Sequence, residues 1–212
     1  MMNRFLRARH WQLFLLTFGI PFFIQLIMMG SMMGSVMSSA ATGTDPDPFI
    51  MLNYMAFFPI VMILYLTVHF GWYYSVAVGL QDKIPSELQL NLKRFKFFFF
   101  FPLTYIVLLI IFMIVGVFGV IQTGGEPDAL LLGVGLTVVL PLHFFSMFCM
   151  FYILYFVSKT LKMAELQRNV SFSDYAGEFF LIWLYPIGIW FVQPKINELA
   201  HRVSTSTERS QV

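Results

Sequence analysis

FFFFFPLTYIVLLIIFMIVGVFGVIQ, at residues 97–122, contains no charged side chain. It is long enough to cross the hydrocarbon core of a membrane, which takes about 20 apolar residues in a helix. Three more stretches are equally free of charge, at 11–33, 49–70 and 129–157. Backbone groups in lipid must pair within their own segment, so each stretch is expected to be an α-helix. The sequence therefore predicts an all-α membrane protein with four transmembrane helices.

The composition of the chain agrees with burial in lipid. Of its 212 residues, 58% are hydrophobic and 11% are charged, whereas soluble domains carry about 25% charged residues. The first apolar stretch, 11–33, is longer than the run of about 7–15 residues in a cleaved signal peptide. We therefore expect an uncleaved first span and one integral membrane domain over residues 1–212.

The charges are divided between the two ends of the predicted helices. All 13 Lys and Arg residues lie at the N-terminus, in 81–96, in 158–178 or after residue 192. The loops within the two helix pairs carry only acids, namely Asp45, Asp47, Glu126 and Asp128. Basic residues collect on the cytoplasmic side of membrane proteins, so a cytoplasmic N-terminus is expected. Such thin basic clusters suit lipid headgroups, and no nucleic-acid partner is expected.

A fifth apolar segment, 179–192, is shorter than the other four. As a helix it would extend about 21 Å, less than a hydrocarbon core of about 30 Å. Pro186 and Gly188 are expected to interrupt it and Pro194 to end it. It is either a short tilted fifth span or a re-entrant segment that returns the C-terminus to the cytoplasm. The second alternative is favoured by the basic residues that follow, Lys195, Arg202 and Arg209.

The chain contains two similar halves. Residues 42–47 read TGTDPD and residues 123–128 read TGGEPD, at an offset of about 81 positions. The phrases ELQLN, at 87–91, and ELQRN, at 165–169, each follow the second helix of a pair. We interpret the chain as two tandem parallel hairpins, at about 10–91 and 92–169. A partial third unit follows at about 172–200, and a disordered tail at 201–212.

Prolines recur at nearly the same offset. Pro21 corresponds to Pro102 in the first helix of each hairpin, and Pro59 corresponds to Pro141 in the second. A proline within a helix removes one backbone hydrogen bond, so a kink is expected at each of these positions. Parallel repeats with broken helices occur in transporters.

His69 and His143 are the two histidines within the predicted spans. Ionisable residues inside a membrane are functional candidates, and two imidazoles at similar depth are able to ligate a b-type haem or relay protons. The alternative is structural, with each ring hydrogen-bonded to a tyrosine or a carbonyl. Tyr65 and Tyr73 lie four residues on either side of His69, on its own helix face.

Other candidate sites are few. Gly30 and Gly34 have the small-xxx-small spacing of helix-packing faces. Pro186 and Gly188 are the best candidates for non-helical backbone along a substrate path. The chain contains none of the common catalytic motifs, and Cys149 is its single cysteine, so neither a catalytic residue nor a metal site is predicted.

The segment FFLIWLYPIGIWFVQPKIN, at 179–197, resembles the C-terminal signature of small uncharacterised bacterial multi-pass membrane proteins. The shared phrase is YPIG-x-W-x-x-Q-P-K-I-N. The resemblance implies a bacterial source and no known activity. With the predicted spans, a bacterial source leads us to expect the inner membrane as the location.

These observations leave three functional hypotheses. The favoured one is a non-enzymatic subunit or accessory of a membrane complex. Its expected partners are the lipid bilayer and either a second copy of the chain, in a homo-oligomer, or another protein of the complex. The alternative is a small transporter or channel built from the duplicated hairpins. The second alternative is a redox protein that binds b-type haem through His69 and His143.

Overall fold

The structure is a computed structural model that describes residues 2–44, 48–122, 129, 133 and 135–209; among these, the side chains of 2–3, 48–59, 117, 118, 120–122 and 202–209 are not described. Every regular element within the described residues is a helix. The chain divides into two compact units: unit 1 comprises Met1–Gly79 and Phe180–Val212, and unit 2 comprises Leu80–Phe179.

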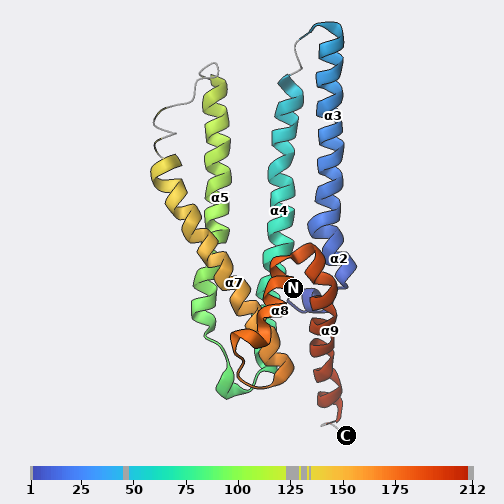
Figure 1. Ribbon diagram of the computed structural model, residues 1–212, viewed down its shortest axis with the longest axis vertical. Coiled ribbons are helices and arrows are strands. Elements are labelled where there is room, and N and C mark those ends of the chain that lie inside the picture. Colours follow the sequence, from blue (N-terminus) through green and yellow to red (C-terminus); the bar gives the residue numbers. More distant parts are fainter. Residues whose placement is uncertain (1, 45–47, 123–128, 130–132, 134, 210–212) are drawn as a thin grey trace. The chain divides into compact units, whose positions relative to one another are not determined.

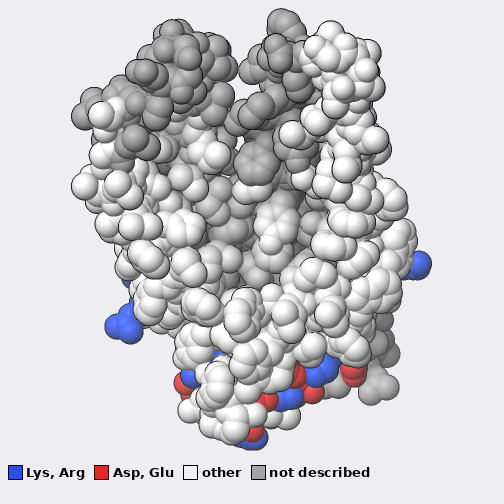
Figure 2. All heavy atoms as spheres, turned by 45° about the horizontal axis from the view of Figure 1, so that its top comes forward, with Lys and Arg blue, Asp and Glu red and all other residues white. Residues whose placement is uncertain are grey.

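Four helical segments are long and apolar enough to cross a membrane, which confirms the predicted number of such helices. They are His10–Thr42, Ile60–Lys83, Leu92–Gly116 and Gly135–Leu166. Figure 2 shows large areas of the described surface without Lys, Arg, Asp or Glu. The four acidic loop residues, Asp45, Asp47, Glu126 and Asp128, lie outside the described residues.

Unit 1 contains the first two spans and the C-terminal helix. Its elements are α1 (Met2–Arg7), α2 (His10–Phe14), the π-helical turn η1 (Leu15–Gly19), α3 (Ile20–Thr42), α4 (Pro48–Gly79) and α9 (Tyr185–Arg209). Helix α1 packs on α4, and α2 packs on α9 (Figure 1). Its core lies where these four helices meet and includes Leu13, Trp72, Tyr73, Ile189 and Ile196.

Unit 2 is built around the pair α5 (Leu92–Gln122) and α7 (Leu140–Leu166), which pack on one another (Figure 1). Phe95 stacks on Phe156 with ring centroids 4.5 Å apart, and Phe98 lies 4.4 Å from Tyr152. The remaining elements are two 3-10 turns, η2 (Gln81–Lys83) and η3 (Ser86–Leu88), the π-helical turn η4 (Gly135–Val139) and most of α8 (Phe172–Trp183).

Two prolines follow π-helical turns. η1 ends just before the Ile20–Pro21 pair, and η4 ends just before Leu140–Pro141. The N–H of Ile20 bonds to the carbonyl of Leu15, five residues back. A proline has no N–H for the usual bond and its ring crowds the preceding turn, so the helix widens there. The shared local structure thus relates Pro21 to Pro141, whereas the proposed repeat relates Pro21 to Pro102, which lies inside α5. The repeat stays a prediction.

The C-terminal apolar segment is broken at Leu184, two residues before the expected Pro186. Helix α8 ends at Trp183, and α9 begins at Tyr185. The expectation that Pro194 ends the helix is wrong, because α9 continues through it. Gln193 and Ile196, on either side of Pro194, are fully buried, and such packing outweighs the cost of about 3 kcal/mol for an interior proline.

Helix α9 continues to Arg209 and so covers part of the expected disordered tail from residue 201. Extending an existing helix needs no new nucleation, which favours helix here. The expectation that 179–192 re-enters the membrane, rather than spanning it, stays a prediction.

Candidate functional site

The side chain of Gln193 joins three separate parts of unit 1. Its Oε1 accepts a hydrogen bond of 2.7 Å from Nε1 of Trp72 in α4. Its Nε2 donates to the main-chain carbonyls of Phe5, at 3.0 Å, and Ala8, at 2.9 Å. Asn197, one turn later in α9, also donates to the Ala8 carbonyl, at 3.2 Å. We call these groups the terminal junction.

The terminal junction adds a hydrogen bond to the Phe5 carbonyl, which also accepts one of 3.3 Å from the N–H of Ala8, and binds the Ala8 carbonyl just beyond α1. The last carbonyls of a helix have no partner within it, and α1 ends at Arg7. Gln193 is fully buried, so the amide supplies hydrogen bonds that water cannot. The junction therefore holds the N-terminal segment against α4 and α9 at one place.

Aromatic rings extend this junction on both sides. Tyr185 meets Trp72 edge-on with centroids 5.4 Å apart. Trp190 lies 4.6 Å from the ring of His10 and 5.7 Å from that of Phe14. The aromatic residues of the YPIG-x-W phrase thus contact both N-terminal spans.

Gly188 permits the break between α8 and α9. A Cβ added there would overlap the main-chain carbonyl of Leu181. Any larger residue must push the start of α9 away from the end of α8. The expectation that Pro186 and Gly188 interrupt the helix is wrong, because both lie inside α9, where Pro186 is exposed in the second position. The proposed substrate path at Pro186 and Gly188 stays a prediction.

His69 is enclosed by tyrosines within unit 1. Its Nε2 lies 2.8 Å from the hydroxyl of Tyr73, its ring stacks on Tyr65 at 4.9 Å, and the ring of Tyr185 meets it edge-on at 4.4 Å. The contact between His69 and Tyr73, four residues away on the same helix, agrees with the spacing noted in the sequence. Its Nδ1 has no hydrogen-bond partner among the described residues.

His143 belongs to unit 2 and is exposed. Its Nδ1 lies 3.2 Å from the hydroxyl of Tyr105 in α5. Each histidine is therefore paired with a tyrosine inside its own unit. The described residues contain no cluster of three His, Cys, Asp or Glu side chains that would hold a metal. Haem ligation by the two histidines stays a prediction.

The predicted helix-packing pair, Gly30 and Gly34, lies on α3. Gly30 and Gly34 are exposed, and a Cβ added to either would meet no described atom within 4 Å. No residue of α3 is buried by the described chain.

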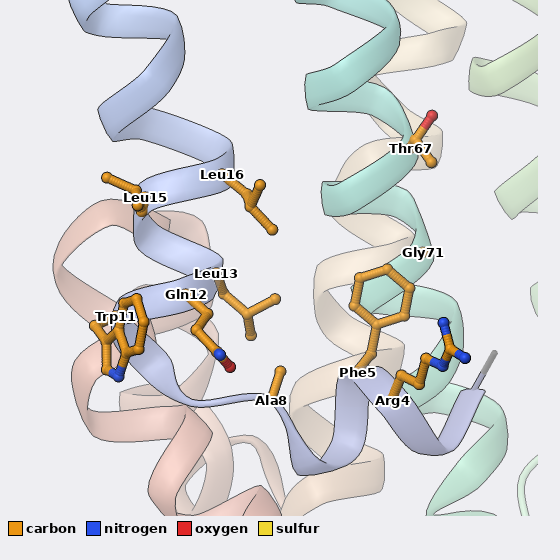
Figure 3. A pocket seen from close by; sticks show the side chains of 10 residues that line it. All are labelled: Arg4, Phe5, Ala8, Trp11, Gln12, Leu13, Leu15, Leu16, Thr67 and Gly71. Atoms are coloured by element: carbon orange, nitrogen blue, oxygen red, sulfur yellow. The ribbon is translucent and has the colours of Figure 1, made fainter.

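A cavity of about 550 Å³ lies beside the terminal junction in unit 1. Figure 3 shows its lining from three elements: Arg4 and Phe5 from α1, Gln12 and Leu16 from the first span, and Gly71 from α4. Gly71 allows α1 to approach, because a Cβ there would come within 2.9 Å of the Phe5 ring.

Sequence reasoning did not identify Arg4, Trp72 or Gln193 as site residues. The one available signal was the C-terminal phrase YPIG-x-W-x-x-Q-P-K-I-N, in which Gln193 is a polar residue that follows an apolar run. Its partners Trp72, Phe5 and Ala8 are more than a hundred residues away, so no local pattern predicts these bonds.

The fold defines an all-helical protein with four helices able to cross a membrane by their length and composition. The sequence matches no protein-family model, and searches of curated proteins and of solved structures find no match. The resemblance of the C-terminal phrase stays a prediction.

Proposed function

We propose that this chain is a non-enzymatic subunit or accessory of a membrane complex in the bacterial inner membrane, with its N-terminus in the cytoplasm and its C-terminus on the same side. The observation that carries this proposal is the open glycine face of α3. Small residues at this spacing let two helices approach closely in lipid, where packing rather than water exclusion drives association. A Cβ added at Gly30 or Gly34 would meet no described atom within 4 Å.

The proposed partner is a transmembrane helix from outside this chain, either a second copy or another protein. Full-length protein would be extracted in mild detergent and its mass measured by native mass spectrometry. We expect the wild type to retain a partner. Gly34→Leu should release it, because a large side chain prevents close helix approach, and its Cβ would meet no described atom of the chain within 4 Å.

Met32→Leu is the matched control. It lies about 200° around the helix from Gly34 and is 43% exposed, so it should leave association unchanged. A wild-type protein that remains a lone monomer, or equal dissociation in both variants, would contradict the proposed role.

The transporter alternative has less support in the described residues. It expects polar groups of the spans to line a cavity. The hydroxyl of Thr137 instead donates to the Gly133 carbonyl of its own helix, at 2.7 Å, and the cavity of unit 1 is lined mainly by apolar side chains.

A further inference from the structure

Most side chains that line the cavity of unit 1 are apolar, and the polar ones are Arg4, Gln12 and Thr67. Figure 3 places Leu15 and Leu16 farther along the first span, and Arg4 and Gln12 nearer the α1–α2 connection. Its volume, about 550 Å³, is within the range of about 300–1,000 Å³ typical of small-molecule sites. Its shape and lining therefore suit an amphiphilic molecule with one polar end.

The polar end of the cavity carries positive charge and hydrogen-bond donors. Arg4 forms no ion pair with any described residue. The Oε1 of Gln12 accepts a hydrogen bond of 3.0 Å from the N–H of Arg9, which leaves its amide N–H groups for another acceptor. A guanidinium with adjacent N–H donors binds phosphate oxygens well.

We propose that this cavity binds one anionic glycerophospholipid of the surrounding membrane. Its phosphate lies at Arg4 and Gln12, and an acyl chain lies against Leu13, Leu15 and Leu16. An anionic lipid is favoured over a zwitterionic one because the latter would bring its own cation beside Arg4. The inference does not depend on the role proposed for the α3 face.

Trp11 provides a direct readout, because it lines the cavity and is 45% exposed. The full chain would carry Trp183→Phe and Trp190→Phe, leaving Trp11 and the buried Trp72, which is 1% exposed and shielded from lipid. The protein would be reconstituted in phosphatidylcholine vesicles containing increasing fractions of phosphatidylglycerol brominated on its acyl chains. Brominated phosphatidylcholine is the reference lipid.

We expect brominated phosphatidylglycerol to half-quench Trp11 at a mole fraction roughly fivefold lower than brominated phosphatidylcholine, the preference expected for one Arg contact. Arg4→Gln should abolish this preference. Arg7→Gln removes the same charge from the same short helix but lies outside the cavity lining, so it should preserve the preference.

The apolar part of the site is tested by filling it. Leu16→Phe adds volume inside the cavity and should reduce the maximal quenching of Trp11 by either lipid. Equal quenching by both lipids in the wild type, or equal loss of preference in the two Arg variants, would overturn the phosphate site. Unchanged maximal quenching in Leu16→Phe would overturn the acyl-chain site.

Discussion

The indole Nε1 of Trp72 donates a hydrogen bond of 2.7 Å to Oε1 of Gln193, 121 residues further along the chain. Both side chains are fully buried or nearly so. The same amide binds the carbonyls of Phe5 and Ala8. One side chain thus fixes both ends of the chain to α4.

Gln193→Leu should destabilise the protein by about 3 kcal/mol. The substitution keeps the volume but leaves the buried Trp72 N–H unpaired, which costs about 1–3 kcal/mol, and removes the two bonds that Nε2 donates. The Phe5 and Ala8 carbonyls each keep one other partner. The measurement is the unfolding midpoint in a denaturing-detergent titration. Gln89→Leu is the control, since Gln89 is exposed and makes one long bond of 3.5 Å. Equal small effects in the two variants would contradict the importance of the junction.

Gly188→Ala should destabilise the protein by about 2–3 kcal/mol, because the added methyl group overlaps the Leu181 carbonyl and overpacking costs this much. Gly177→Ala in α8 is the matched control: its Cβ meets nothing within 4 Å, and the change should stabilise by up to about 1 kcal/mol. Both are measured by thermal unfolding in detergent. A Gly188→Ala variant as stable as Gly177→Ala would refute the close approach of α8 and α9.

Asp174 stabilises the start of α8. Its carboxylate accepts a hydrogen bond of 2.8 Å from the N–H of Ser171 and pairs with Arg168 at 2.9 Å. These contacts, the Ser171 backbone bond foremost, lower the pKa of Asp174 to about 2. Because the folded-state pKa is depressed, the stabilisation is present above the unfolded value of about 4 and is lost as pH falls through about 2.

We therefore expect the stability difference between wild type and Asp174→Asn to be largest above pH 4 and to shrink as pH falls toward 2. Unfolding midpoints of both proteins across this range provide the measurement. A difference that does not change with pH would show that the charge of Asp174 plays no part.

A topology reporter fused after Val212 should give a cytoplasmic signal. Basic residues follow the segment 179–192 and favour the cytoplasmic side. A fusion after Thr44, between α3 and α4, serves as the control and should report the opposite side. A periplasmic signal after Val212 would show that the C-terminal segment spans the membrane.

The purified protein should show no Soret absorption band. The Nε2 of His69 already faces the Tyr73 hydroxyl at 2.8 Å, so a haem iron would have to displace this partner. His69→Leu and His143→Leu should leave the absorption spectrum unchanged. A Soret band that disappears in both variants would instead support the haem hypothesis.

Local patterns predict much of this fold. Runs without charge predicted the four helices, since lipid requires paired backbone groups within each segment. Spacing by four residues predicted that Tyr73 meets His69, because such residues share a helix face. Neither inference needs knowledge of distant segments.

The continuation of α9 through Pro194 could not be predicted in this way. Its local signal favours a helix end, and the outcome was decided by the burial of Gln193 and Ile196 against other helices. The Gly188 contact with Leu181 and the cavity beside Arg4 likewise depend on how separate helices approach.

The sequence by itself therefore determined the number of apolar helices, the grouping of charge at their ends and the pairing of His69 with its neighbour on the same helix. These depend on length, composition and helical period. Only the tertiary structure decided which carbonyls Gln193 binds, where α8 ends and α9 begins, and which side chains line the cavity. Those features arise from contacts between residues far apart in the chain, whose energies exceed the local preferences that a sequence displays.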